Sequence, residues 1–290
     1  MYATRDIDSK NTLGNAKIKS YATQILRLIL NRYLYYMITI DYNVMELILI
    51  IFYMLIGLIT GFYSGIFGIG GASLRIPLLT MTGMPLINAF ATNIFAIPFS
   101  SACGAYVQRH NIRWNIAKIF VIGGIAGIMV ATFLVGIVSD KLLAIIFFMI
   151  AIVTVFALYL DTISPKLYNK IRPLPMNLFF GSFLVTLIMG MQGGSGGSLF
   201  SALLRAMHVK IHSAIAISLF AGIFTSSSAL LIYFYRGEIV IIPAFIVAFT
   251  GMIGSYAGSK LSMCTDSKFL KIGLSIMVIF LASIVLLKYI

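Results

Sequence analysis

Charged residues are scarce in this sequence. Asp, Glu, Lys and Arg make up 10% of its 290 residues, whereas 60% of the residues are hydrophobic. A soluble domain carries about 25% charged residues, so the composition excludes a soluble protein and predicts a polytopic membrane protein. The apolar runs are continuous and do not alternate with polar residues, which predicts helices and not the strands of a barrel.

Acidic residues are the scarcer charged type. The eight Asp and Glu lie in the N-terminal tail or at the ends of apolar segments, and none lies in the middle of a segment. A carboxylate proton relay within the membrane therefore has no candidate. The net charge is +13, but the Lys and Arg lie in tails and loops, as the positive-inside rule expects. The lipid bilayer is the expected partner, and nucleic acid is not.

Cysteine and histidine are also rare. Cys103 and Cys264 are far apart and fit no metal or redox spacing, so we expect no disulfide, no metal site and no cofactor. His208 and His212 flank the predicted edge of an apolar segment. Their positions fit either a pH-sensing role or ordinary solvated loop histidines.

Glycine, by contrast, is concentrated in two stretches, GIFGIGGAS at residues 65–73 and GMQGGSGGS at residues 190–198. Each glycine weakens a helix by roughly 1 kcal/mol relative to alanine. We therefore predict that a membrane helix breaks at each stretch and that a short helix begins near Ser73 and near Ser198. Tight helix crossings are the alternative explanation of the glycines. Crossings suit Gly123 and Gly251, but they fit two adjacent glycines poorly.

The two stretches belong to an internal repeat. Residues 125 positions apart match without a gap, as Gly68 matches Gly193 and Gly71 matches Gly196. Duplicated halves with matching interruptions point to the binding site of a secondary transporter. The domains we expect are an N-terminal cytoplasmic or interfacial extension (1–44), a first membrane repeat (45–160), a cytoplasmic linker (161–177) and a second membrane repeat (178–290). The alternative for residues 1–44 is that they are not native and that the true start is Met37 or Met45.

The fold class predicted is an all-α polytopic membrane protein with about eight transmembrane helices in two homologous halves. Each half contains one glycine-rich broken or re-entrant segment. The crossings include residues 86–107 and 211–235. Counting each broken segment as one crossing makes the repeats parallel and puts both termini on the cytoplasmic side. A re-entrant hairpin at the breaks would change this count.

The broken segments carry the candidate site. A helix that begins inside the membrane presents free N–H groups and about half a positive charge, which together bind anions. Arg75, whose repeat partner is Phe200, would pair with an anionic substrate or snorkel toward a loop. Asn93 would either line the site or form an interhelical hydrogen bond, and the sequence favours neither role. The candidate substrate-binding residues are Gly68, Gly70, Gly71, Ser73, Arg75, Asn93, Gly193, Gly194, Ser195, Gly196 and Ser198.

Ser195 also fits a different class of function. Residues 193–196 match G-x-S-G, the nucleophile motif of rhomboid-type intramembrane serine proteases. A serine nucleophile needs a histidine base within hydrogen-bond reach, and no histidine follows His212. We therefore expect a carrier and not an enzyme, with no catalytic residue. An anion channel is the third alternative.

Residues 61–79, GFYSGIFGIGGASLRIPLL, are followed by GMP at 83–85 and AFATN at 89–93. Together they resemble the signature of the sulfite exporter TauE/SafE family, and the second glycine-rich stretch resembles that family's second copy. The similarity extends from about residue 45 to the C-terminus. It implies a bacterial-type inner-membrane permease for a small anion, often a sulfur-containing oxoanion or an organosulfonate. The transport we expect is alternating access around the two half-helix N-termini. Ala72 and Ala202 depart from the pattern, where a glycine and a proline are usual.

Overall fold

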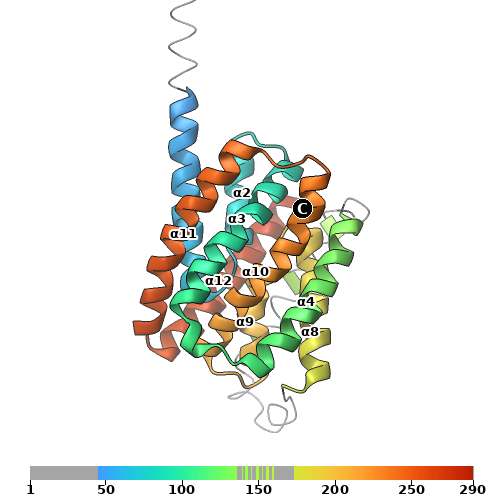
Figure 1. The fold of residues 1–290 in the computed structure, drawn as a ribbon, viewed down its shortest axis with the longest axis vertical. Helices are drawn as coiled ribbons and strands as arrows, with labels where there is room; N and C mark the ends of the chain where they lie inside the picture. Colours follow the sequence, from blue (N-terminus) through green and yellow to red (C-terminus); the bar gives the residue numbers. More distant parts are fainter. Residues whose placement is uncertain are drawn as a thin grey trace, which may run out of the picture. The chain divides into compact units, whose positions relative to one another are not determined.

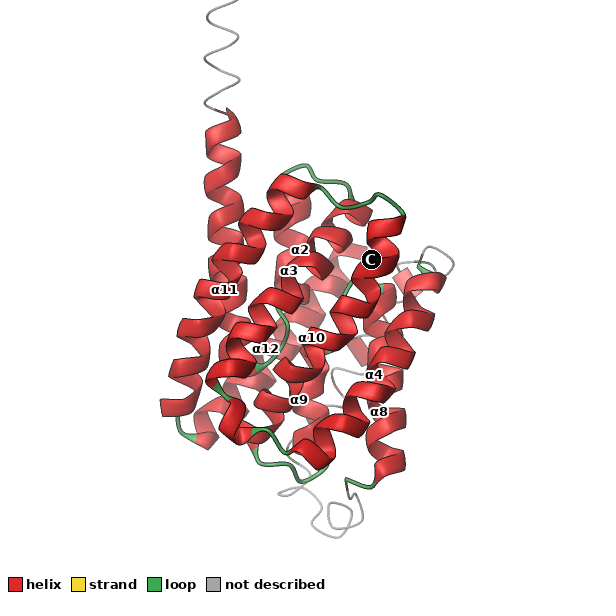
Figure 2. Ribbon diagram, in the orientation of Figure 1, coloured by secondary structure: helices red, strands yellow, loops and turns green. Residues whose placement is uncertain are grey.

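The computed structural model describes residues 45–135 and 173–289, with scattered residues between 139 and 159. The regular structure of these described residues is helical (Figure 2), which confirms the all-α class. Residues 51–290 form one compact unit, which includes residues of both predicted membrane repeats. The predicted extension at 1–44 and nearly all of the predicted linker at 161–177 lie outside the described residues.

In chain order, the described helices are Met45–Phe67, α2 (Ala72–Met81), α3 (Leu86–Val107), the 3-10 turn η1 (Arg109–Asn111), α4 (Trp114–Leu134), α8 (Pro175–Met191), α9 (Gly197–Ala206), α10 (Ile211–Tyr235), α11 (Ile241–Cys264) and α12 (Ser267–Tyr289). Five of them are long and apolar enough to cross a membrane. The main helix contacts join elements that are distant in sequence: α4 packs on α8, and α3 packs on α10 and α11 (Figure 1). The predicted bounds of α3 and α10 are confirmed at both ends.

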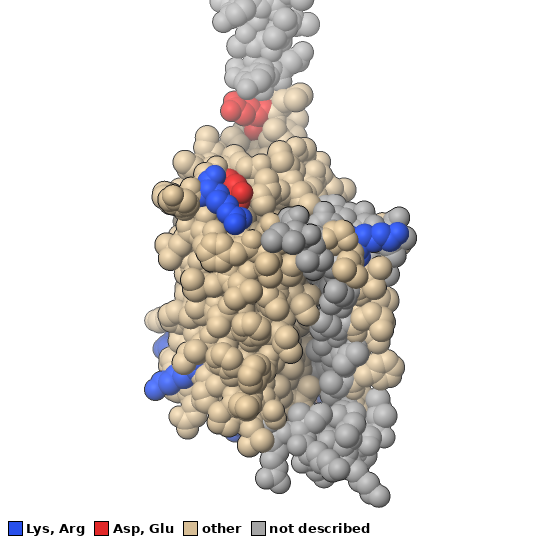
Figure 3. Space-filling model, turned by 90° about the vertical axis from the view of Figure 1, so that its right-hand side faces the viewer, with Lys and Arg blue, Asp and Glu red and all other residues tan. Residues whose placement is uncertain are grey.

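The outer surface of the bundle is apolar. Large hydrophobic side chains on α10 and α11 are exposed, among them Leu231 at 74%, Phe234 at 76% and Phe249 at 66%. On the face shown in Figure 3, the charged side chains of the described residues lie toward the two ends, and the tan surface between them shows none. Such a continuous apolar surface is unfavourable in water and favourable in lipid, so the chain is a multi-pass membrane protein.

The chain turns back at the first glycine stretch. Arg75 of α2 contacts Thr60 of the preceding helix at 3.1 Å, and Thr82, just beyond α2, contacts Tyr53 at 3.3 Å. Later residues of α2 therefore lie beside earlier residues of the helix Met45–Phe67. The two helices form an antiparallel hairpin whose tip is Gly68–Gly71.

The second glycine stretch forms an equivalent hairpin. A Cβ atom on Gly181 of α8 would lie 3.1 Å from Leu203 and 3.2 Å from Met207, near the end of α9. At the other end of α9, a Cβ atom on Gly196 would lie 2.7 Å from Thr186. The bounds of α2 and α9 are 125 residues apart at both their first and their last residues. This is the offset of the sequence repeat.

The two hairpins enter the bundle from opposite ends. Helices α3 and α10 are antiparallel, because Asn88 donates a 2.8 Å hydrogen bond to the carbonyl of Glu238 while Gly222 faces Ser101. The α2–α3 turn therefore lies at one end and the α9–α10 turn at the other, with α2 in the upper part and α9 in the lower part of Figure 1.

This arrangement corrects the expectation of one crossing per broken segment and of parallel repeats. Each broken segment returns to the end from which it came, and the two hairpins are inverted relative to each other. The physical reason is local to the glycines. Gly68, Gly70 and Gly71 have φ values of 69°, 68° and 72°, a left-handed conformation that reverses the chain and that glycine adopts without a steric penalty.

Helices of one half pack against helices of the other through glycine. A Cβ on Gly254 of α11 would lie 2.8 Å from the backbone nitrogen of Phe62, and a Cβ on Gly61 would lie 2.8 Å from Cα of Gly251. A Cβ on Gly123 of α4 would come 2.9 Å from Cα of Phe179 in α8. Helix α11 thus packs on the first hairpin and α4 on the second. The expected tight glycine crossings are confirmed.

Candidate functional site

The tips of the two hairpins meet inside the bundle. A Cβ atom on Gly197, the first residue of α9, would lie 3.0 Å from Cα of Gly70, just before α2. A Cβ atom on Gly70 would lie 3.5 Å from the hydroxyl of Ser195. Because α2 and α9 begin at these tips, their positive N-terminal ends converge on one buried place. Such ends bind anions.

Arg75 supplies the charged side chain at this place. It lies in the first turn of α2, and its side chain is completely buried. Its Nε donates to Thr60 Oγ1 at 3.1 Å and its Nη1 donates to Asn93 Oδ1 at 3.1 Å, while Nη2 has no hydrogen-bond partner. Both partners are neutral, so the described residues that bond Arg75 leave its charge uncompensated.

Asn93 joins Arg75 to the opposite hairpin. Its Nδ2 donates a 2.8 Å hydrogen bond to the carbonyl of Gly193, while its Oδ1 accepts from Arg75. Ser218, the repeat partner of Asn93, donates to the carbonyl of Gly68, the repeat partner of Gly193. Each long helix after a hairpin therefore holds the glycine tip of the other half. Asn93 thus bonds the loop before α9 from α3, and its place in a binding site stays a prediction.

The second tip contributes Ser195 and Gly196. Ser195 is 1% exposed, and its hydroxyl has no hydrogen-bond partner among the described residues, although its carbonyl accepts from Thr225 Oγ1 at 3.1 Å. Gly196 precedes α9 with φ 85°, as Gly71 precedes α2 with φ 72°. The backbone of Gly194 is held by a 2.8 Å bond to the carbonyl of Met189.

The structure thus brings nine of the predicted residues together at the two tips. Ser73 and Ser198 occupy early positions in α2 and α9, but their side chains lie outside what the structure describes. Sequence reasoning missed Thr60 and Thr225, because a single threonine within an apolar helix gives no signal. Ser218 could be found from the sequence, because it is the repeat partner of Asn93.

The two tips differ chemically. Phe200, the repeat partner of Arg75, is fully buried and packs edge-on against Phe120 at 4.7 Å. Its ring closes over Gly196, where an added Cβ atom would meet it at 2.7 Å. A buried guanidinium is therefore present on one side of the meeting point, and an aromatic ring occupies the equivalent place on the other.

The geometry does not pair Ser195 with a base. Its hydroxyl has no described partner, and His212 instead contacts Ser267 at 3.5 Å at an end of the bundle. Nucleophilic catalysis needs a hydroxyl and a base in hydrogen-bond reach. In the described residues, Ser195 is placed as an unpaired donor facing the other tip.

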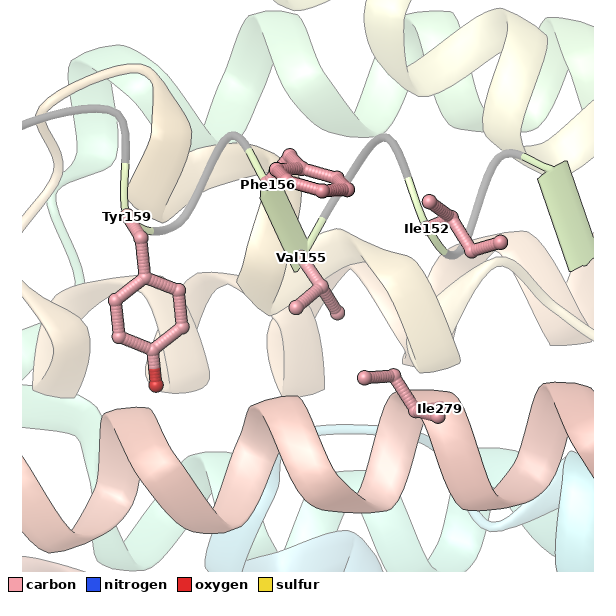
Figure 4. A pocket seen from close by; sticks show the side chains of 5 residues that line it. All are labelled: Ile152, Val155, Phe156, Tyr159 and Ile279. Carbon is pink, nitrogen blue, oxygen red and sulfur yellow. The ribbon is translucent and has the colours of Figure 1, made fainter. Parts of the chain in front are cut away.

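An apolar groove elsewhere has none of this chemistry. It lies between residues 152–159 and α12, where Figure 4 shows Val155 and Tyr159 directed toward the helix that carries Ile279. Its lining is apolar except for the Tyr159 hydroxyl, which lies 3.4 Å from Ser275. A groove of this kind suits acyl chains and not a small anion.

Comparison with known proteins extends these observations. The chain is 40% identical over 75 residues to a "Probable membrane transporter protein" of Xylella fastidiosa, but this match spans 29% of the relative and 25% of the chain. It is 24% identical over 249 residues to a protein of the same name from Haemophilus influenzae, covering 91% of that relative and 74% of the chain. A Methanocaldococcus jannaschii "Probable membrane transporter protein" is 46% identical over 52 residues, 20% of that relative and 18% of the chain.

No solved structure is significantly similar to the chain. The family described as "Sulfite exporter TauE/SafE" matches residues 53–285. That range covers both glycine hairpins, the two helices that hold their tips, and α11. The chain therefore belongs to the sulfite exporter TauE/SafE family of membrane transporters.

Proposed function

We propose that this protein is a secondary carrier for a small anion, which binds between the two hairpin tips with Arg75 as its counter-charge. The observation that carries the proposal is the buried guanidinium with an unpartnered Nη2 and only neutral partners. A buried charge needs compensation, and an anionic substrate at the N-terminal ends of α2 and α9 supplies it. The family's name makes sulfur oxoanions and organosulfonates the first substrates to test.

Alternating access follows from the contact between the tips. Gly70 and Gly197 lie too close for an anion to sit between them, so the tips separate for a substrate to bind. Because the hairpins enter from opposite ends, withdrawing one hairpin opens a path to one side of the membrane while the other stays closed. Because the chain belongs to this family, we propose that it lies in a bacterial-type inner membrane.

A flux assay tests the proposal. Purified full-length protein in proteoliposomes is offered sulfite, thiosulfate, a small organosulfonate and a small carboxylate. We expect saturable uptake of at least one sulfur-containing anion, and accumulation against its gradient when a driving gradient is imposed. Uptake that rises linearly without saturation would indicate a channel, and no uptake of any of these anions would refute the proposal.

A further inference from the structure

A second group of buried polar side chains surrounds the end of the first hairpin's long helix. It lies between the helix Met45–Phe67, α3 and α11. Its members are the carbonyl of Gly65, Gln108, Ser255 and Ser259, and the three side chains are all 0% exposed. We call this group the oxygen cluster. None of its members belongs to the anion site.

The members of the oxygen cluster converge on a small volume. The Gly65 carbonyl accepts bonds of 3.3 Å from both Gln108 Nε2 and Ser259 Oγ. A Cβ atom on Gly104 of α3 would lie 2.8 Å from both Ser255 Oγ and Ser259 Oγ. Three helices thus bring side-chain and main-chain oxygens within a few ångströms of one another.

Two of these oxygens lack partners. Gln108 Oε1 and Ser255 Oγ make no hydrogen bond among the described residues. Gln108 is anchored through its other amide atom at the Gly65 carbonyl, so its unpartnered oxygen remains inside the cluster. Buried polar atoms in proteins almost always have a partner, and unpaired ones are unfavourable in a medium of low dielectric constant.

The fold itself does not require polar residues here. The equivalent place in the second hairpin is Gly190, where an added Cβ atom would meet Ile128 at 2.5 Å and Ala131 at 2.6 Å. There the side chains that face the glycine are apolar and fill the space. Tyr233, the repeat partner of Gln108, is also buried with an unpartnered hydroxyl, but the glutamine and serines of the oxygen cluster lie at the first hairpin, which also carries Arg75.

We infer that the oxygen cluster binds a monovalent cation, sodium by its chemistry, that is coupled to anion transport. The atoms that could coordinate an ion here are neutral oxygens, which are the ligands that hard cations take. No group of three or more His, Cys, Asp or Glu occurs among the described residues, so a divalent ion finds no charged ligands. The C-terminal end of a helix carries a partial negative charge that favours a cation, and broken transporter helices bind sodium at such ends.

The coupling part of this inference rests on the proposed function. Gly65 lies three residues before Gly68, whose carbonyl Ser218 holds. A cation bound by Gln108 and Ser255, beside Gly65, fixes the end of the long helix and so fixes the tip from which α2 begins. Ion binding then stabilises one position of the hairpin and helps to form the anion site, which is how a sodium gradient would drive the anion.

The test measures sodium binding without any substrate. Purified full-length protein in detergent is heated in sodium chloride, potassium chloride or choline chloride at equal ionic strength, and unfolding is followed by intrinsic fluorescence. We expect sodium alone to raise the unfolding temperature in a saturable way. Ser255→Ala and Gln108→Leu should each weaken the apparent sodium affinity by about tenfold or more, as loss of a supporting interaction does at metal sites.

Thr132→Val is the matched control. Thr132 lies on α4, which packs on the second hairpin as α11 packs on the first, and its hydroxyl bonds only the carbonyl of Ile128 at 2.7 Å. This variant should keep the wild-type response to sodium. A response to sodium no larger than that to choline would overturn the inference and would show that the cluster holds water.

Flux measurements keep the two proposals apart. If anion uptake is saturable but indifferent to sodium, and sodium does not stabilise the protein, the cation site is refuted and the carrier stands. If sodium binds and Ser255→Ala abolishes its binding while no anion is transported, the cation site stands and the carrier function is refuted.

Discussion

At the scale of single residues, Arg75 is the side chain on which the proposed anion binding depends. Its charge is fully buried and is bonded only to Thr60 and Asn93. A cation in this setting is unfavourable until an anion joins it. The free-energy cost of burying this charge when no anion is bound is consistent with a binding role. A purely structural contact would be made equally well by an apolar side chain such as Phe200.

We predict that Arg75→Ala abolishes or strongly weakens anion uptake while the protein still inserts into the membrane. Hydrogen bonds to charged groups contribute about 1.5–3 kcal/mol, so initial uptake at low substrate should fall by about tenfold or more. Initial rates in proteoliposomes with equal amounts of folded protein measure this.

Arg109→Ala is the control for loss of a positive charge, because Arg109 is exposed and bonds the carbonyl of Tyr106. It should transport like the wild type. Equal uptake by wild type and Arg75→Ala would remove Arg75 from the site.

At the scale of elements, the hairpins depend on glycines that no other residue replaces easily. Gly71 has φ 72°, and an added Cβ atom would lie 3.1 Å from both Arg75 Nη2 and the carbonyl of Thr60. A non-glycine residue in this conformation costs roughly 1–2 kcal/mol in backbone strain, and the side chain also displaces Arg75. The repeat partner, Gly196, is in the same situation against Phe200.

We predict that Gly71→Val and Gly196→Val each destroy transport, because each displaces a buried side chain at a tip. Gly83→Ala is the control. Gly83 also has a positive φ of 86°, but an added Cβ atom meets nothing within 4 Å, and its repeat partner is His208 with φ 65°. Backbone strain alone should therefore leave transport nearly intact.

Uptake in proteoliposomes, with chromatography in detergent to verify folding, compares the three variants. Normal transport by both valine variants would refute the role of the paired tips. A loss as large in Gly83→Ala would show that strain, and not the tip contacts, is responsible.

At the scale of the whole molecule, positive charge is distributed unevenly between the two ends of the bundle. The end that carries the α3–α4 connection and the α9–α10 turn holds most of the described Lys and Arg: Arg109, Arg113, Lys118, Arg205, Lys210, Lys260, Lys268 and Lys271. The opposite end holds Lys141, Arg236 and, near the last residue of α12, Lys288. The positive-inside rule favours the first end as the cytoplasmic one.

This orientation changes the expectation for the C-terminus. Helix α12 begins beside His212 at the basic end and has 23 residues, about 34 Å at 1.5 Å per residue. It therefore runs from the proposed cytoplasmic end to the other. We propose that its last residues face away from the cytoplasm, in place of the cytoplasmic C-terminus that the crossing count implied.

Thiol labelling tests the orientation. Cys264 is exposed near the basic end, and a cysteine introduced as Arg236→Cys marks the opposite end. With Cys103→Ser in both cases, and Cys264→Ser added to the second, each variant has one thiol. We expect a membrane-impermeant maleimide to label Arg236→Cys in intact cells and Cys264 only after permeabilisation. The opposite pattern would reverse the orientation.

The sequence by itself determined the membrane class, the ends of α3 and α10, and the positions where both long helices break. These properties depend on local hydrophobicity and on the poor helix propensity of glycine, which neighbours in space do not alter. The 125-residue offset also fixed which residues are equivalent.

Only the tertiary structure decided that the broken segments turn back and meet tip to tip. Chain direction after a break depends on the φ values of a few glycines, such as Gly71, and on contacts far apart in sequence. These contacts join residues from 43 to 194 positions apart: Asn93 bonds the carbonyl of Gly193, and both Gln108 and Ser259 bond the carbonyl of Gly65. Such pairs come together because helices of one half pack into the other, and no local pattern records which helices do so.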